Sequence, residues 1–257
     1  MIDSHCHLDV PAFDRDREAV LARAAALTGI LVPAIRPSTW AALREITHPL
    51  IRPVIRIALG IHPQIVPELT ADEAITVDAL AEAALAAGAV AIGETGLDGA
   101  TGERERQEEL LRLHVHAARL AKLPLVVHVL RAHDAAPRIL REERAHEVGG
   151  VMHSYSGGAD LVPIYRDLGF AFSFAGPVTY PNARRPLEAV RAVPPELLLV
   201  ETDAPHQAPA SHRGERSEPA FLPEILAAVA AARGDDVAWI TALTTANARR
   251  VFRAWTK

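Results

Sequence analysis

Short runs of consecutive apolar residues alternate along the chain with longer segments in which apolar residues recur every three or four positions. The runs have the length of strands, and most of them lack the apolar–polar alternation of a strand that is exposed on one face. They cover residues 2–8, 29–35, 54–60, 89–93, 124–129, 149–153, 170–174 and 197–202. Continuous apolar runs are typical of strands buried on both faces, so we expect a parallel sheet covered by helices.

The periodic segments between the runs predict these helices. They cover residues 15–27, 71–87, 103–121 and 183–193, and two more helices are expected at 221–233 and 236–255, the last with a break near Thr244. Eight strands with a helix after nearly every one favour an α/β fold of the (β/α)8 TIM barrel type. Such a barrel needs about 250 residues, so we expect residues 1–257 to form one domain. A doubly wound open sheet is the alternative.

Ionisable residues stand at the C-terminal ends of five of the runs, where a buried strand would otherwise be apolar. They are His5, His7, Glu94, His128, His153 and Asp203. In a (β/α)8 barrel the C-terminal strand ends meet on the face that carries the active site. A single buried histidine is more often a hydrogen-bonded core residue, but six such residues at equivalent barrel positions predict a site for Zn, Mn or Mg.

Composition narrows the kinds of site that the chain can build. Its 257 residues include 12 His and one Cys, so a thiolate metal site and a disulfide framework are both excluded. With 32 acidic and 27 basic residues the net charge is -5, which excludes a basic coat for nucleic acid but leaves room for a local basic groove. The chain shows neither a signal-peptide pattern nor an apolar run of about 18 residues, so we expect a cytoplasmic protein without membrane contact.

Several motifs together carry a family resemblance. They stand at residues 5–9 (HCHLD), 60–63 (GIHP), 93–98 (GETGLD), 153–157 (HSYSG) and 201–205 (ETDAP). In this order the chain resembles the TatD-like metal-dependent deoxyribonucleases of the amidohydrolase superfamily. The resemblance implies a (β/α)8 barrel and a site for two or three divalent metal ions. It also implies 3′-to-5′ exonuclease or related phosphodiesterase activity. The implied substrate is nucleic acid, either single strands or the 3′ ends of strands.

The residues suggest roles within that chemistry. Glu94 is the natural bridging carboxylate, because its two oxygens can serve two metal ions. Asp203 is a candidate to take the proton from the attacking water. The resemblance implies that His5, His7 and Asp203 hold one metal, and that His128 and His153 hold the other.

Four further residues are candidate substrate contacts. His62 ends the third run and fits a phosphate contact, Arg131 and Arg216 can bind phosphate as forks, and Tyr155 can stack on a base. Each also has an alternative interpretation. His62 can be a histidine of a turn, each arginine can form a surface ion pair, and Tyr155 can pack in the core. The chain departs from the family pattern at Gly99 and Ala100, where an aromatic residue is usual, and in the apolar residues before Arg131. These departures put the substrate preference in question.

Two other functions stay open. Barrel hydrolases with such sites also cleave esters and amides, for example as aminoacyl-tRNA deacylases, because a fold does not determine a function. A bridging lysine on the fourth strand would have favoured the phosphotriesterase branch, and Glu94 stands there instead. A non-catalytic binding barrel is the third hypothesis, although a degenerate site would be expected to lack ligands. No obligate protein partner is expected.

Overall fold

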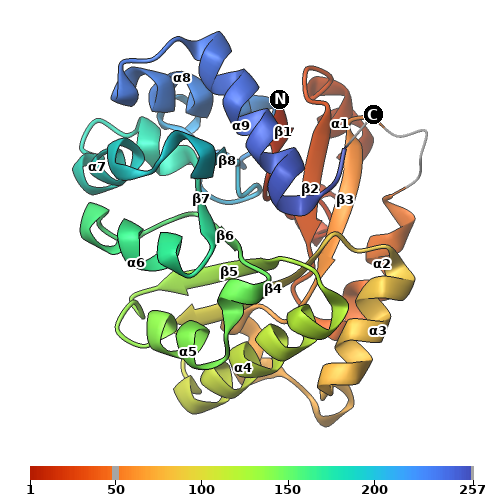
Figure 1. The fold of residues 1–257 in the computed structure, drawn as a ribbon. Helices are drawn as coiled ribbons and strands as arrows, with labels where there is room; N and C mark the ends of the chain where they lie inside the picture. The colour runs from red at the N-terminus through yellow and green to blue at the C-terminus, as the bar shows by residue number, and fades with distance from the viewer. Residues whose placement is uncertain (48–51, 256–257) are drawn as a thin grey trace.

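The computed structural model describes residues 1–47 and 52–255 of the chain. In these residues eight strands form one parallel sheet whose spatial order follows the chain order (Figure 1). The strands are β1 (Ile2–Asp3), β2 (Gly29–Pro33), β3 (Val54–Leu59), β4 (Ala91–Asp98), β5 (Leu125–Leu130), β6 (Gly150–Met152), β7 (Phe170–Phe174) and β8 (Leu198–Val200). Each overlaps a predicted run, but β4 continues past its run to Asp98, so Glu94 lies within this strand and not at its end.

Hydrogen bonds between the first and last strands close the sheet into a barrel. The amide of Ser4, just after β1, donates to the carbonyl of Val200 in β8 at 3.2 Å. The amide of Asp203 donates to the carbonyl of His5 at 2.9 Å. A doubly wound sheet would reverse its strand order and keep two open edges. The fold is therefore the (β/α)8 barrel.

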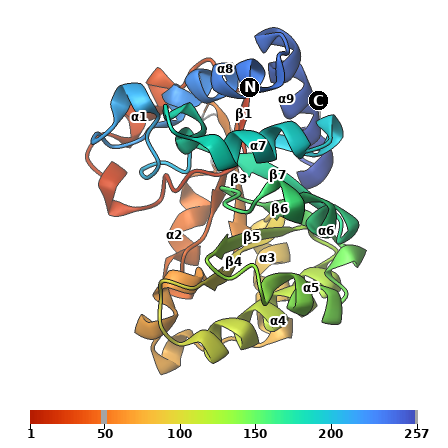
Figure 2. The ribbon, with the colours of Figure 1, turned by 90° about the vertical axis from the view of Figure 1, so that its left-hand side faces the viewer.

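Helices surround the strands in two views at right angles (Figure 1, Figure 2). They are α1 (Arg17–Arg23), α2 (Trp40–Glu45), α3 (Val77–Ala87), α4 (Arg104–Ala121), α5 (Ala136–Glu142), α6 (Val162–Asp167), α7 (Arg184–Ala192), α8 (Leu222–Arg233) and α9 (Val237–Phe252). Local sequence determines several of their ends. For example, the Thr76 hydroxyl accepts from the amide of Ala79 at the start of α3, and Gly88 ends that helix with a φ of 66°.

One prediction about the helices is wrong. The break expected near Thr244 does not occur, and α9 continues through this position. The Thr244 hydroxyl donates to the carbonyl of Ile240 at 2.9 Å, four residues earlier. A threonine can stay within a helix when its hydroxyl bonds back to the preceding turn in this way. None of the helices in the described part of the chain is long and apolar enough to cross a membrane.

Apolar side chains fill the inside of the barrel, and every strand contributes one of them. These are Ile2, Leu31, Ala58, Ala91, Val126, Val151, Ala171 and Leu199. Phe252 and Trp255 pack against this layer from the end of α9 and the residues after it, and the Trp255 indole donates to the carbonyl of Val54 at the start of β3. The N-terminal ends of the strands are thus closed, which leaves the opposite end for a site.

Candidate metal centre

Glu94 reaches the barrel interior because β4 is irregular at this point. The pairing of β4 with β5 shifts register between Ile92 and Thr95, as at a β-bulge, and such bulges redirect side chains. Two glycines permit the close packing around it. A Cβ at Gly93 would lie 2.6 Å from the carbonyl of Val126, and one at Gly96 would lie 1.9 Å from the carbonyl of His128. The side chain of Glu94 is fully buried.

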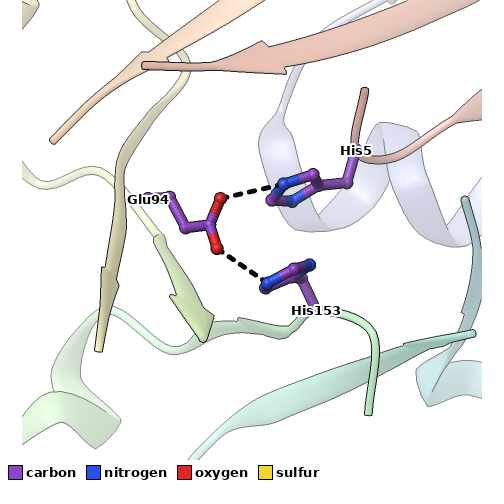
Figure 3. A group of neighbouring side chains, drawn as sticks. All are labelled: His5, Glu94 and His153. Atoms are coloured by element: carbon purple, nitrogen blue, oxygen red, sulfur yellow. Dashed lines mark ion pairs between the residues drawn. The ribbon is translucent and has the colours of Figure 1, made fainter. Parts of the chain in front are cut away.

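The Glu94 carboxylate lies between two groups of imidazole rings. Its Oε2 atom is 3.0 Å from Nε2 of His5 and 3.3 Å from Nε2 of His7. Its Oε1 atom is 2.8 Å from Nε2 of His153 and 3.2 Å from Nδ1 of His128. Figure 3 shows the first member of each group, with His5 on one oxygen and His153 on the other. Each carboxylate oxygen therefore faces its own pair of ring nitrogens.

Asp203 completes the first group. Its Oδ1 atom lies 3.7 Å from Nε2 of both His5 and His7. Within three overlapping sets the potential ligand atoms all lie within 4.8 Å of one another. The sets are His5–His7–Asp203, His5–Glu94–His153 and His62–Glu94–His128. The structure thus brings together all six residues that the sequence predicts as metal ligands.

The contacts within this cluster call for a cation. Nε2 of His5 lies 3.1 Å from Nε2 of His7, and Nδ1 of His128 lies 3.0 Å from Nε2 of His153. Two ring-nitrogen lone pairs can face each other at such a distance only with a proton or a metal ion between them. Both oxygens of Glu94 are buried without a hydrogen bond. Imidazole and carboxylate groups in this arrangement suit a divalent ion.

The electrostatics of the cluster also favour positive charge. Burial alone would raise the pKa of Glu94, but the surrounding rings of His153, His62 and His5 hold it well below its usual range. Burial would lower the pKa of His7, and Glu94 and Asp203 outweigh it and raise the pKa to about 9. The buried carboxylates thus hold a proton on His7, which a bound metal ion would displace, whereas burial lowers the pKa of His5 and His62 and leaves these rings neutral for ligation.

A second layer of polar groups holds the rings in place. Asp98 Oδ2 lies 3.3 Å from Nε2 of His128 and accepts from the Gln64 side-chain amide at 2.8 Å. Glu201 Oε1 lies 3.4 Å from Nδ1 of His153, and Nδ1 of His7 lies 3.3 Å from the carbonyl of Pro33. Such partners fix the orientation of histidine ligands.

Gln207 is a site residue that the sequence does not reveal. Its side-chain amide donates to Oδ2 of Asp203, and its carbonyl oxygen accepts from the Ser154 hydroxyl at 2.8 Å. It lies in the loop after Asp203, where no periodicity or motif marks it. Only the folded loop brings it to the centre.

The predicted substrate contacts have different surroundings. His62 Nε2 lies 2.9 Å from Oε1 of Glu94, so this histidine is itself placed among the possible ligands. Arg131 is exposed after β5 and forms no ion pair with the residues that the structure describes. The Tyr155 ring is 4% exposed and its hydroxyl donates to the carbonyl of Gly158, so neither face is free to stack on a base.

Arg216 is engaged elsewhere. Its guanidinium lies 2.7 Å from a carboxylate oxygen of Asp16 and 2.8 Å from one of Glu218. It also lies over the ring of Phe13. These carboxylates occupy the fork that was expected to bind phosphate, so the alternative, a surface ion pair, describes this residue.

The cluster opens into a cavity of about 350 Å³, which we call the metal cavity. Its wall includes His7, His62, His128, His153, Asp203, His206 and Gln207. A substrate in this cavity would therefore contact four of the five histidines that surround Glu94.

Comparison with known proteins finds similarity along nearly the whole chain. The sequence model of the family described as TatD related DNase matches residues 2–253. An uncharacterized metal-dependent hydrolase of Bacillus subtilis, YabD, is 33% identical over 258 residues, which cover 98% of this chain and 99% of YabD. Another from Escherichia coli, YcfH, is 34% identical over 259 residues, covering 98% of this chain and 95% of YcfH.

A solved structure agrees with these matches. The crystal structure of YjjV, a TatD homolog from Escherichia coli, superimposes with a TM-score of 0.89 and 30% sequence identity. The superposition covers 99% of this chain and 98% of that one.

Proposed function

We propose a phosphodiesterase function for this chain, which belongs to the family of TatD-related DNases. Within this family of metal-dependent hydrolases, we assign to it the cleavage of nucleic acid, DNA above all, from the 3′ end. The observation that carries the proposal is the placement of Glu94, with one oxygen facing His5 and His7 and the other facing His128 and His153.

The residues around Glu94 fit two divalent ions, and its two carboxylate oxygens would each face one of them. His5, His7 and Asp203 would hold one ion, and His128 and His153 would hold the other, with His62 as a further ligand or a phosphate contact. Bound there, the ions would activate a water and neutralise charge on the phosphodiester. Zn, Mn and Mg are all candidates, because imidazole suits Zn while carboxylates suit Mg and Mn.

The protein's own groups would then position the substrate and move the proton. Asp203 faces the metal cavity, and Gln207 holds its Oδ2, so its carboxylate can accept the proton of the attacking water. Three arginines at the same end of the barrel, two in loops and one in the first turn of α7, would supply positive charge for the substrate backbone. Arg131, Arg185 and Arg213 follow β5, β7 and β8, are exposed, and form no ion pair with the described residues. Phosphate contacts of this kind position a strand without reading its sequence.

Digestion of a 5′-labelled single-stranded DNA oligonucleotide tests the proposal. With Mg²⁺, Mn²⁺ or Zn²⁺ added, the wild-type protein should shorten the labelled strand stepwise from its 3′ end, and Glu94→Ala should abolish this activity. Glu105→Ala is the matched control, because Glu105 is an exposed glutamate on α4. Failure of the wild type with all three ions, or full activity of E94A, would refute the proposal. Cleavage of p-nitrophenyl esters without cleavage of bis-p-nitrophenyl phosphate would favour the ester hydrolase instead.

A further inference from the structure

A second cavity, of about 290 Å³, adjoins the metal cavity, and we call it the side cavity. The two share His128, His153 and Gln207 in their walls, so the side cavity begins at the rings that face Glu94. It is bounded by the ends of β5, β6 and β7 and by the start of α7. A group joined to a phosphate at the metal centre would therefore lie next to this cavity.

Most of the side cavity is apolar. Its apolar wall includes Val129, Leu130, Phe174, Pro177, Val178 and Pro186. These side chains are short or rigid, and none of them carries a charge. The volume of about 290 Å³ lies just below that of the pockets that hold small-molecule ligands, about 300–1,000 Å³. The space thus suits one compact uncharged group and excludes a second phosphate or a folded polymer.

One side of the cavity is polar. The Ser156 hydroxyl donates to the carbonyl of Val129 at 2.8 Å, and its oxygen also lies 3.3 Å from Nε2 of His133. The Ser154 hydroxyl and the Gln207 amide are also in the wall, bonded to each other at 2.8 Å. Both groups keep unused hydrogen-bonding capacity, because the Gln207 amide has a second N–H and the Ser154 oxygen has lone pairs. The edge of a heterocyclic ring carries donors and acceptors that could pair with these groups, and an aliphatic group does not.

We propose that the side cavity holds the nucleobase of the nucleotide whose phosphate lies at the metal centre. The inference rests on the proposed function, because it takes a nucleotide as the substrate. It replaces the base contact that the sequence assigns to Tyr155. That ring lies in the wall of the same cavity but is packed in T-shaped contacts against Phe172 and Tyr165. The base would be held by apolar walls and a polar edge rather than by stacking on an exposed aromatic ring.

Calorimetric binding tests the inference without requiring turnover. In the presence of Mn²⁺, the wild-type protein should bind thymidine 5′-monophosphate about tenfold more tightly than 2-deoxyribose 5-phosphate, which lacks the base and buries less apolar surface. Ala175 lies in the cavity wall and is 3% exposed, so Ala175→Leu fills the space. In A175L the two ligands should bind equally, with the affinity for the sugar phosphate unchanged.

Two further variants make the test specific. Pro186→Phe adds bulk from α7 at a partly exposed position of the same wall, and it should remove the preference even where A175L fails to fold. Ala86→Leu, on the exposed face of α3, should keep it. The inference is overturned if the wild type shows no preference, if folded P186F retains it, or if hexyl phosphate binds as tightly as the nucleotide. A nucleotide preference without oligonucleotide cleavage would support the side cavity and refute the nuclease proposal.

Discussion

Asp98 and His128 form a carboxylate–imidazole pair directly behind the metal centre. Asp98 Oδ2 lies 3.3 Å from Nε2 of the ring, and the opposite nitrogen, Nδ1, lies 3.2 Å from Oε1 of Glu94. In the tautomer that carries its proton on Nε2, His128 donates to Asp98 and presents the Nδ1 lone pair to the centre. Both residues stand at the ends of neighbouring strands, so the barrel itself sets this orientation.

Asn in place of Asp98 should weaken metal binding. The amide lacks the charge that holds the imidazole, and loss of such a partner typically costs 10–100-fold in metal affinity. Titration of the metal-free protein with Zn²⁺ measures the effect directly. Circular dichroism of the same samples should show unchanged helix content. An affinity equal to that of the wild type would contradict this role for Asp98.

Leu in place of Gln207 should reduce turnover. The variant keeps most of the volume but frees Oδ2 of Asp203, which Gln207 holds. We expect kcat to fall by about 10-fold, less than the roughly 100- to 10,000-fold contribution of a general acid–base group because Asp203 itself remains, while KM changes little. Steady-state kinetics on bis-p-nitrophenyl phosphate provide both values. A rise in KM at constant kcat would instead assign Gln207 to substrate binding.

The stability of the protein should depend on pH through His114, which is not among the candidate metal ligands. Nε2 of this buried ring accepts from the amide of Ile61 at 3.0 Å, and Nδ1 lies 2.7 Å from the carbonyl of Leu110. Burial lowers its pKa to about 4. Because an unfolded histidine titrates near 6.5, the unfolded chain binds more protons between these values, and stability is lost as the pH falls from about 6.5 toward 4.

This effect can be separated from other titrations by a variant. At pH 5, the shift corresponds to about 2 kcal/mol relative to neutral pH. Urea unfolding at pH 7.5 and pH 5 should therefore show a fall in the free energy of unfolding that is about 2 kcal/mol smaller in His114→Gln than in the wild type. The exposed His146→Gln should behave like the wild type. Equal pH dependence in all three proteins would contradict the prediction.

Removal of metal should lower the thermal stability. An ion that binds only the folded chain stabilises it by about 2.7 kcal/mol at a concentration 100 times its Kd. For a domain of this size we expect Tm to rise by roughly 5–10 °C when Mn²⁺ or Zn²⁺ is added to chelator-treated protein. Differential scanning calorimetry measures the shift, and E105A should show it in full. No shift in the wild type would argue against a structural link between metal and fold.

The sequence predicts the barrel and its six candidate metal ligands because both follow from the regular pattern of apolar runs. Strands buried on both faces appear as apolar runs, and ionisable residues at the ends of those runs, such as His128 and Asp203, are conspicuous. The register shift that orients Glu94 has no such signal, although the neighbouring Gly93 and Gly96 hint at close backbone approach.

Other contacts depend on pairings between distant segments, which a single sequence does not reveal. Arg216 carries a guanidinium that could bind phosphate, but the fold brings Asp16, 200 residues away in sequence, next to it. Tyr155 is likewise removed from solvent by aromatic residues of β7. The position of Gln207 depends on a loop without a recognisable pattern.

The measurement that tests the central claim most directly is the number of metal ions bound per chain. Titration of metal-free protein, checked by elemental analysis, should find two equivalents of divalent ion in the wild type and at most one in Glu94→Gln, because the neutral amide cannot bridge two ions. Fewer than one equivalent in the wild type, or two tightly bound equivalents in E94Q, would contradict a centre built around Glu94.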